Sequence, residues 1–418
     1  MFDVKVIRRQ FPALQRGGGE RPAVLFDGPA GTQVPERVID AVREYFITCN
    51  ANHGGYFATS RRSDEIVTSA HAAMADLLNA SSPDEVVFGP NMTTLTLHLS
   101  RSIAKTLRPG DEVLVTRMDH DANVTPWVLA ARDAGAMVGY VDIHPDDCTL
   151  DLQDLRRQLS AKTRLVAVAC ASNAVGTIND VRTITRMAHE AGALVFLDAV
   201  HYAPHGAIDV QEWGCDFLVC SAYKFFGPHI GILWGKNEQL ARLPAYKLRP
   251  VPDRLPDRWM TGTQNHECLA GVAACIDYLA ELGAASPEFA KQGGSMVGRR
   301  GQLRAAMAAI RAYEAKLGKQ LLDDLASRPR FRVWGIKDPE KLNQRVPTIS
   351  ITHESRPASE IAQHLAARDI YVWSGNMYAL ELTERLGLED RGGLLRIGLI
   401  HYNTSEEIDR LFRALDEF

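Results

Sequence analysis

Nearly continuous apolar segments, rich in β-branched residues, recur between residues 85 and 235 and alternate with segments of helical pattern. An apolar run without polar alternation predicts a strand buried on both faces, and strands that alternate with helices predict a mostly parallel sheet. The seven expected strands are residues 86–88, 112–116, 137–141, 165–169, 194–198, 217–221 and 231–234. The sequence therefore predicts a large α/β domain whose sheet is covered by helices.

Helical patterns fill the spaces between these strands, and a second, smaller pattern follows them. Helices are expected at residues 93–107, 124–134, 181–191 and 268–279, and a proline-rich stretch at 243–258 predicts a surface excursion. Later in the chain, strands are expected at 331–335, 348–352 and 394–400 and helices at 300–326, 358–368 and 405–418. We therefore expect an N-terminal arm at 1–25 that packs on the small domain, a large domain at 26–285 and a small α+β domain at 286–418.

Composition excludes several classes of protein. The chain has 418 residues with 47 Lys and Arg against 51 Asp and Glu, so its net charge of −4 supplies no basic field for nucleic acid or anionic lipid. Its seven cysteines are scattered without a CxxC pair, which is typical of a reducing compartment rather than of a disulfide framework or a metal site. The N-terminus becomes charged at once, and no segment reaches the ~18 apolar residues of a membrane span. A cytoplasmic protein without nucleic-acid or membrane partners is expected.

Ionisable side chains directly follow two strands of the predicted sheet. Asp198 ends one strand, and Lys224 stands three residues after Ser221 ends another. Because ligands bind at the carboxyl ends of strands in an open α/β sheet, both side chains are candidates for chemistry. A single loop lysine is usually solvated, but two phenylalanines and a Gly-Pro pair follow this one. A lysine amine that condenses with an aldehyde and a carboxylate that keeps a pyridine nitrogen protonated are the minimal pair for pyridoxal phosphate chemistry.

The spacing Asp198-x-x-His201 followed by Ser221-x-x-Lys224 resembles fold-type I pyridoxal-phosphate enzymes of the class V aminotransferase family, especially the branch of cysteine desulfurases and selenocysteine lyases. The likeness extends over nearly the whole chain. It implies a homodimer that binds pyridoxal 5′-phosphate and acts on an α-amino acid. It also implies that Lys224 forms the Schiff base and later moves protons, and that Asp198 contacts the pyridine nitrogen of the cofactor.

The same resemblance assigns further residues to the cofactor. His120 would stack on its ring, and Asn173 and His201 would lie at its phenolic oxygen, although the family often has Gln where His201 stands. The phosphate group would be bound by Thr93, Thr94, Ser221 and Tyr223, and by Thr263 from the neighbouring subunit. Structural alternatives stay open for most of them: helix caps for the two threonines after Asn91, a turn residue for Asn173, a satisfied strand-end histidine for His201 and an ordinary loop for Thr263.

Substrate contacts are implied less completely. Arg396 matches the arginine that binds the α-carboxylate of the substrate, a role that suits its fork of donors. Asn52 and His53 match a loop at the border of the pocket, and Asn376 is expected to shape the pocket wall. Asp119 and Asp121 flank His120, but neighbours along a chain rarely point at one ion, so no metal site is expected.

One departure from the family pattern limits the reaction. Cysteine desulfurases present a cysteine on a mobile loop of the small domain, whereas Tyr378 stands at that position here and Trp373 replaces an arginine before it. No cysteine follows Cys275 in this sequence, which argues against a persulfide. Three outcomes remain after the Cα proton is removed: elimination of a sulfur, selenium or sulfinate group, transamination, and epimerisation.

The sequence favours a lyase, with an aminotransferase second. A non-catalytic module that keeps the cofactor is a further alternative, but intact Lys224, Asp198 and Arg396 argue against it.

Overall fold

A seven-stranded sheet forms the centre of the computed structural model, which describes residues 2–16, 22–294 and 296–418. The strand order is β2 (Val86–Gly89), β10 (Gly231–Gly235), β9 (Phe217–Ser221), β8 (Leu194–Asp198), β7 (Thr163–Ala169), β3 (Glu112–Thr116) and β4 (Met137–Val141). Strand β10 runs antiparallel to its two neighbours, and the remaining pairs are parallel. The predicted fold class is confirmed, and each predicted strand lies within two residues of an observed one.

Alternate residues of these strands enter two different cores, which is why the strands are apolar throughout. Val195 and Leu197 of β8 pack into one hydrophobic cluster, while Phe196 between them packs into another on the opposite face. In β3, Leu114 packs into the first cluster, and Val113 and Val115 pack into the second. This is the two-residue period of a strand with both faces covered. Each such side chain contributes about 1.5–3 kcal/mol when it is withdrawn from water.

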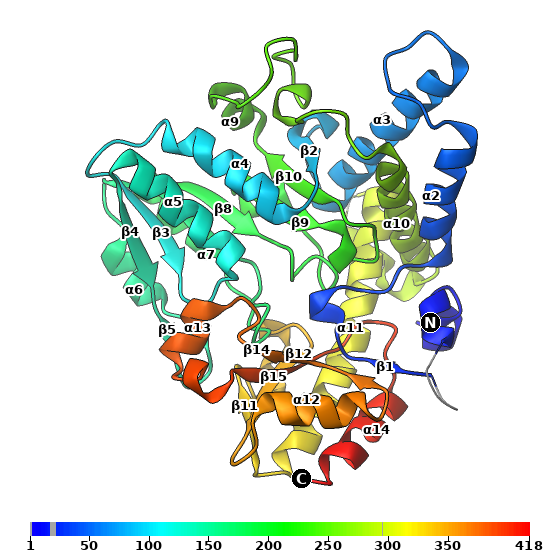
Figure 1. Ribbon diagram of the computed structural model, residues 1–418, viewed down its shortest axis with the longest axis vertical. Coiled ribbons are helices and arrows are strands. Elements are labelled where there is room, and N and C mark those ends of the chain that lie inside the picture. Colours follow the sequence, from blue (N-terminus) through cyan, green and yellow to red (C-terminus); the bar gives the residue numbers. More distant parts are fainter. Residues whose placement is uncertain (1, 17–21, 295) are drawn as a thin grey trace.

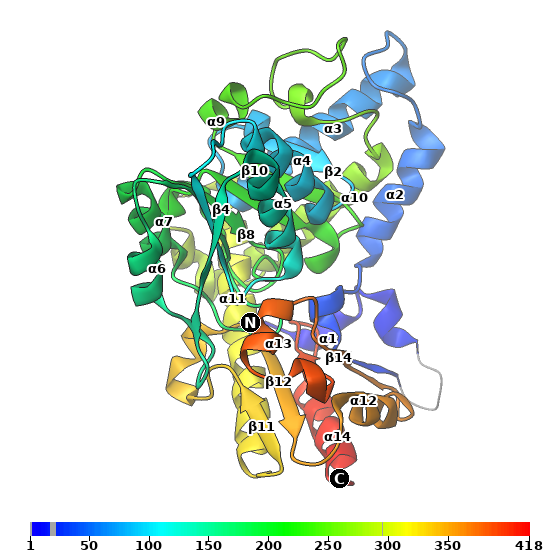
Figure 2. The same ribbon diagram turned by 60° about the vertical axis from the view of Figure 1, so that its left-hand side comes forward.

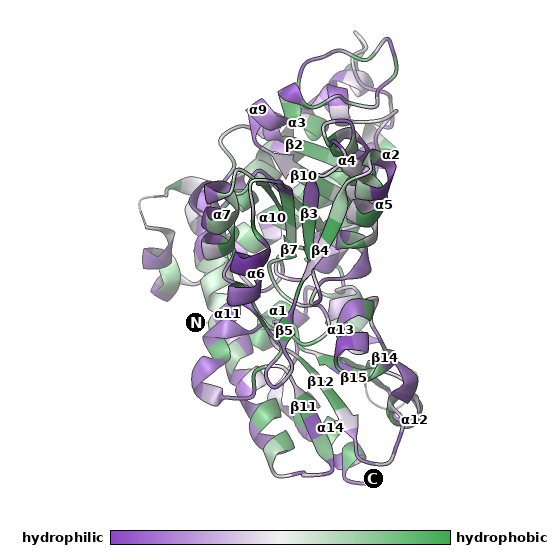
Figure 3. Cartoon of the chain, turned by 90° about the vertical axis from the view of Figure 1, so that its left-hand side faces the viewer, coloured by the Kyte–Doolittle hydropathy of each residue, from purple (hydrophilic) through white to green (hydrophobic). Residues whose placement is uncertain are grey.

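Helices complete both layers of the large domain. Figure 1 shows α4 (Met92–Ala104) and α5 (Thr125–Ala134) in front of the sheet, where Leu99 and Trp127 join the same cluster as Phe196. The opposite face is covered by α3 (Ala58–Leu78), α7 (Val181–Glu190) and α10 (His266–Ala284). Shorter helices lie around the sheet: α6 (Leu152–Gln158), α8 (Val210–Trp213) and α9 (Asn237–Arg242). Figure 3 shows hydrophobic strands β3 and β7 inside the large domain, behind the hydrophilic helix α6.

A second, antiparallel sheet lies at the other end of the molecule. Its order is β11 (Phe331–Trp334), β12 (Thr348–His353), β15 (Leu394–Gly398) and β14 (Trp373–Gly375). The helices of this part are α11 (Gly298–Ala326), α12 (Ala358–Ala366), α13 (Leu380–Arg385) and α14 (Ser405–Leu415). Figure 2 shows α12 and α14 packed beside β11 and β12, below the large sheet. The sequence predicts three of these strands and three of the helices, but not β14 or α13.

Helix α11 and the N-terminal residues connect the two parts. Leu303 and Met307 of α11 pack into the core of the large domain, whereas Leu321 and Leu325 pack into the core of the small one. Near the N-terminus lie α1 (Val4–Arg8), α2 (Glu36–Thr48) and the short strand β1 (Val24–Leu25), which pairs in parallel with β13 (Ile370–Tyr371). A further small ribbon pairs β5 (Ile143–His144) with β6 (Thr149–Leu150).

The division at 1–25, 26–285 and 286–418 stays a prediction, and residues 1 and 17–21 of the predicted arm lie outside the described residues. Among the helices of the described ranges, none is both long and apolar enough to span a bilayer.

Candidate active site

A cavity of about 440 Å³ opens at the carboxyl ends of β7, β8 and β9, where the small domain meets the large one. Ten of the residues predicted from the sequence line it together: Thr93, His120, Asn173, Asp198, His201, Ser221, Tyr223, Lys224, Asn376 and Arg396. They come from segments more than 300 residues apart, so the fold itself assembles the site. Thr94, Asn52, His53 and Thr263 do not line this cavity.

Lys224 lies in a short 3-10 turn directly after β9. Its Nζ donates a hydrogen bond to the backbone oxygen of Pro29. The pKa of Lys224 is lowered from 10.5 to about 7, first by burial and then by the charge of Arg396, while Asp198 opposes the shift. A large fraction of this amine is therefore unprotonated at neutral pH, as a nucleophile or a base requires.

Asp198 ends β8 with its carboxyl group buried at the floor of the cavity. Its side chain accepts a hydrogen bond of 2.8 Å from the backbone N–H of Val200. Burial raises the pKa of Asp198 to about 6, and the Val200 N–H and the Lys224 charge oppose the rise. The carboxylate is thus mainly ionised at pH 7, and it can hold a proton on a heteroaromatic nitrogen placed against it.

His120 caps a short 3-10 turn beyond β3. Its Nδ1 accepts a hydrogen bond of 3.0 Å from the N–H of Ala122, so the neutral ring carries its proton on Nε2. Burial, followed by the charges of Lys224 and Arg396, lowers the pKa of His120 to about 4. The ring of Tyr378 lies nearly parallel to it, with 5.4 Å between the centroids. A neutral, flat ring of this kind is suited to stacking on an aromatic ligand.

Asp119, which the sequence singled out only as a neighbour of His120, is fully buried beneath the site. Its carboxyl oxygens accept hydrogen bonds from Thr116 Oγ1 and, at 2.7 Å, from Asn123 Nδ2. Asn123 in turn accepts from Trp127 Nε1 at 3.0 Å. Burial raises the pKa of Asp119 to about 8. This network fixes the turn that carries His120, and no sequence motif identified it.

Arg396 and Asn173 lie side by side on the small-domain side of the cavity. Arg396 is 5% exposed, and its Nη1 donates a hydrogen bond of 2.9 Å to the backbone oxygen of Asn173. Its Nε is buried without a hydrogen-bond partner, and burial lowers the pKa of Arg396 to about 10, so it stays charged. Asn173 Nδ2 donates to the backbone oxygen of Met377 at 2.8 Å, which leaves Asn173 Oδ1 buried and unpartnered. His201 Nε2 lies 3.0 Å from Thr348 Oγ1.

The other end of the cavity is the N-terminus of α4. The Asn91 side chain caps the helix by accepting from the N–H of Thr94, and Ser221 Oγ accepts from the N–H of Met92 at 3.0 Å. The dipole at a helix N-terminus favours an anion such as a phosphate group. Thr93 faces the cavity here, whereas Thr94 Oγ1 bonds to Asn91 at 3.0 Å and is used in the cap. The ring of Tyr223 stacks on His229 with 5.0 Å between the centroids.

Three predicted residues are exposed on this single chain, away from the cavity. Asn52 accepts a hydrogen bond from the backbone of His53, and His53 Nδ1 lies 3.8 Å from Asp64. Thr263 is exposed in the loop before α10. Their roles stay predictions.

The sequence reasoning missed the segment that contributes Pro29 and Ala30 to the lining. Gly398 allows that segment to approach, because a Cβ at this position would lie 1.9 Å from Pro29 Cδ. The Gly-Pro pair at 28–29 predicts a turn, but nothing local places that turn at the end of a distant strand.

Comparison with known proteins decides the family. The profile of "Aminotransferase class-V" matches residues 24–292 and 303–411. The chain belongs to the class V aminotransferase family. Among its class V relatives, "Aminotransferase-like protein FGM3" of Gibberella zeae is 33% identical, over 99% of this chain and 98% of that protein. A probable cysteine desulfurase of Synechocystis is 32% identical, over 98% of this chain and 94% of the relative.

Solved structures of class V enzymes have the same fold. The cysteine desulfurase CsdA of Escherichia coli superposes with a TM-score of 0.84 at 26% identity, over 100% of this chain and 98% of that one. The cysteine desulfurase of Thermococcus onnurineus gives 0.86 at 24% identity, over 99% and 97% of the two chains. The predicted family and fold are therefore confirmed, and the chain is a pyridoxal-phosphate-dependent enzyme.

The residues of the cavity fit the cofactor of the class V family. The cavity combines an amine of lowered pKa with a buried carboxylate, an unpartnered amide oxygen at Asn173 and a helix N-terminus. These groups match, in chemical type, an aldehyde, a pyridine nitrogen, a hydroxyl and a phosphate.

Proposed function

We propose that this chain is a pyridoxal-phosphate-dependent lyase that removes a β-substituent from an α-amino acid without forming a cysteine persulfide. The observation that carries the proposal is a cavity with a lysine, a carboxylate and an arginine but without a thiol. All seven cysteines lie in the described residues, and none is among those that line the cavity. Burial also raises the pKa of six of them, Cys220 and Cys275 included, so those thiols stay protonated.

Binding of the substrate falls to Arg396. Its buried Nε and its second terminal nitrogen are available to a carboxylate, while Nη1 is held by the backbone of Asn173. A bidentate pair of this kind fixes the orientation of the amino acid as well as its affinity. Lys224 lines the same cavity as Arg396.

Lys224 then acts as the base. Pyridoxal phosphate, when bound, supplies an electron-withdrawing ring that makes the Cα proton of the substrate acidic. Lys224 takes that proton, and its pKa of about 7 places both protonation states within reach at neutral pH. The ionised Asp198 stabilises positive charge at the pyridine nitrogen, and each pKa unit of that stabilisation is about 1.36 kcal/mol.

Elimination balances without an oxidant or a second substrate. The Cα–H and Cβ–S bonds break, the electron pair of the former becomes a Cα–Cβ double bond, and the sulfur leaves as a thiolate with the other pair. Water then converts the released enamine into pyruvate and ammonium. For a thioether substrate the products are one thiol, one pyruvate and one ammonium ion.

An aminotransferase is the second candidate. The likeness to "Aminotransferase-like protein FGM3" favours it, because that relative covers almost the whole chain. The residues that bind the substrate and remove the Cα proton would be the same in both reactions.

Product stoichiometry distinguishes the two reactions. Purified enzyme loaded with pyridoxal phosphate is incubated with β-substituted amino acids, cysteine sulfinate included, without a keto-acid acceptor. The proposal predicts many turnovers for each cofactor: pyruvate with equal ammonium from a thioether or thiol substrate, or alanine with equal sulfite from cysteine sulfinate. One keto acid and one pyridoxamine phosphate for each cofactor would identify an aminotransferase instead.

We also propose a homodimer in which Thr263 contributes to the phosphate site of the neighbouring subunit. Support comes from large apolar side chains that are exposed on α2 and in the loop after it: Ile39, Phe46, Ile47, Tyr56 and Phe57. Large apolar side chains left exposed near one another in the chain are candidates for an interface between subunits. A cytoplasmic location and the absence of nucleic-acid or membrane partners stay predictions from composition.

A further inference from the structure

Residues 373–378 of the small domain, here called the covering segment, form one wall of the cavity. The wall presents large aromatic and thioether groups: residue Trp373 is 51% exposed, residue Tyr378 is 72% exposed, and Met377 is partly buried against the core. Exposed aromatic side chains at the mouth of a pocket offer apolar contact area to a ligand.

The covering segment is fixed to the large domain through its backbone. Tyr378 O accepts a hydrogen bond of 2.7 Å from the N–H of Asp121, and Met377 O accepts one of 2.8 Å from Asn173. Met377 and Tyr378 both have φ of 58°. Residues other than glycine rarely adopt this left-handed backbone conformation, and they keep it where the surrounding structure holds it. These contacts fix the backbone conformation of the wall.

Asn376 supports the same wall rather than the substrate in this structure. Its Nδ2 donates to Glu389 Oε1 at 2.9 Å, and its Oδ1 accepts from the N–H of Tyr378 at 3.1 Å. Glu389 also accepts a hydrogen bond of 2.7 Å from Thr383. Both ends of the Asn376 amide are thus used within the small domain.

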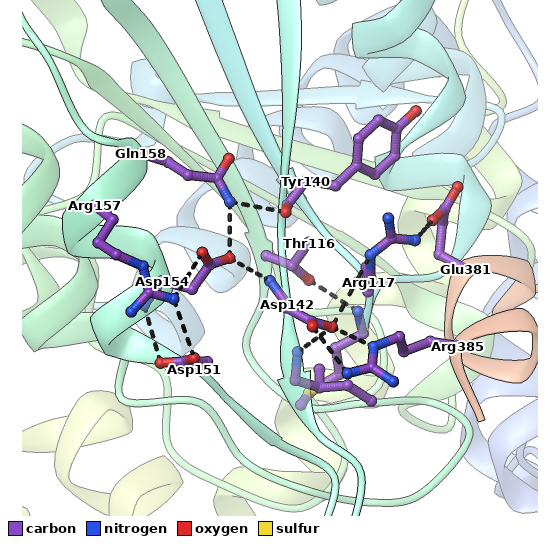
Figure 4. A network of polar contacts seen from close by, with 12 residues as sticks. Thr116, Arg117, Tyr140, Asp142, Asp151, Asp154, Arg157, Gln158, Glu381 and Arg385 are labelled. Carbon is purple, nitrogen blue, oxygen red and sulfur yellow. Dashed lines mark hydrogen bonds and ion pairs between the residues drawn. The ribbon is translucent and has the colours of Figure 1, made fainter.

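Ion pairs hold α13, which follows the covering segment, against the large domain. Figure 4 shows Arg117 beside Glu381 and Arg385 beside Asp142. Arg117 Nη1 lies 2.6 Å from Glu381 Oε2, and Arg385 donates to the two oxygens of Asp142 at 2.7 and 3.0 Å. Single surface pairs contribute little, but a network with a two-point arginine contact fixes orientation.

The charged side chains among the described residues of the lining are Asp198, Lys224 and Arg396, and the proposed function uses all three. Burial keeps the pKa of both His120 and His201 low, so these rings are neutral. The wall left for the substrate's own side chain is the covering segment. A charged group placed there would lose water without gaining a partner, whereas an apolar group would gain contact area.

We propose that the covering segment selects amino acids whose β-substituent is uncharged and apolar, and that Trp373 and Tyr378 determine this specificity. The substrate class is an S- or Se-substituted cysteine with an apolar substituent, rather than cysteine sulfinate. This inference rests on the proposed function, because it assumes that Arg396 binds the α-carboxylate.

A pair of substrates of equal shape tests the inference. S-Isobutyl-L-cysteine and S-carboxymethyl-L-cysteine differ mainly in whether two methyl groups or two carboxylate oxygens end the side chain. Each is titrated into holoenzyme, and its dissociation constant is read from the visible absorbance of the bound cofactor. We expect the isobutyl compound to bind at least tenfold more tightly, and the same order for leucine over aspartate.

Substitutions test whether Trp373 and Tyr378 cause the preference for an apolar β-substituent. Trp373→Ala and Tyr378→Ala should reduce the ratio to below about threefold, with little change in the dissociation constant of L-alanine. Tyr371→Ala is the matched control, because Tyr371 is an exposed aromatic residue of the neighbouring strand that does not line the cavity. It should keep the wild-type ratio. Circular dichroism and cofactor content establish that each variant folds.

The outcomes separate the two proposals. Equal or tighter binding of S-carboxymethyl-L-cysteine or cysteine sulfinate by wild-type enzyme overturns the specificity and leaves the lyase proposal standing. An unchanged ratio in both variants overturns the assignment to Trp373 and Tyr378. Loss of the cofactor band, or no spectral change with any amino acid, overturns the proposed function and this inference with it.

Discussion

Lys224 illustrates how one residue is prepared for its reaction at the expense of stability. Its folded pKa of about 7 lies below the value of 10.5 that it has in an unfolded chain. Between these values the unfolded chain binds the additional proton. The contribution of Lys224 to stability is therefore unfavourable at neutral pH, and the free energy of unfolding rises as pH increases from about 7 toward 10.5.

Lys224→Met should consequently stabilise the cofactor-free protein. We expect the free energy of unfolding at pH 7 to rise by roughly 2–4 kcal/mol, since about 1.36 kcal/mol corresponds to each pKa unit. The gain should shrink as pH approaches 10. Urea unfolding of both proteins at pH 7 and at pH 9.5 measures it. A gain that grows with pH would contradict the lowered pKa.

Many residues of the site could be predicted from the sequence, because ligands bind at the carboxyl ends of strands in an open α/β sheet. Asp198 and Lys224 directly follow apolar strands, so local pattern was enough to select them. The hydrogen-bond partners of Asn376 and the network around Asp119 could not be predicted, because no sequence motif identifies these hydrogen bonds.

The sequence predicts the strands of the large sheet more reliably than it predicts the helices. The seven strands of the large sheet are apolar on both faces, and the sequence predicts all of them. It does not predict α2, in which Val38 and Tyr45 are the buried residues, or α3. Strand β14 is three residues long and contains Gly375 with φ of 120°. Its existence depends on pairing with β15, a contact that local propensity cannot reveal.

Gly176 lies where the large domain approaches the small one, and replacing it should lower stability. Gly176 has φ of 79°, and a Cβ there would lie 2.4 Å from the backbone oxygen of Thr348 in the small domain. Gly214 has a similar φ of 70°, but its Cβ would meet its nearest neighbour at 3.8 Å. Gly176→Ala should cost about 2–4 kcal/mol of stability, against about 1 kcal/mol for the control Gly214→Ala. Equal losses in thermal or urea unfolding would show that the two domains do not approach closely at Gly176.

At the scale of the whole molecule, the two domains form one site, and the proposed dimer would complete it. The cavity needs Lys224 from the large domain and Arg396 from the small one. The ion pairs of Figure 4 join the domains beside this cavity. The contacts between the domains and the wall formed by the covering segment are therefore parts of the same arrangement.

Mixed dimers test whether Thr263 acts across the subunit boundary. Lys224→Ala and Thr263→Asp should each be inactive alone. After unfolding and refolding together, they should recover about a quarter of wild-type activity, because half of the dimers would be mixed and each would contain one intact site. Lys224→Ala mixed with Arg396→Ala is the control and should recover none, since both residues serve their own chain. No recovery with Thr263→Asp would contradict the exchange.

Elimination without a persulfide leaves the mass of the protein unchanged during turnover, and mass spectrometry can follow this. The intact mass of the protein is followed during turnover of an S-alkyl-L-cysteine and of L-cysteine, with pyruvate and ammonium quantified in the same samples. We predict that product accumulates well beyond the amount of enzyme while no cysteine gains a sulfur atom. A protein species heavier by one sulfur, formed and consumed at the rate of turnover, would show that the reaction proceeds through a persulfide.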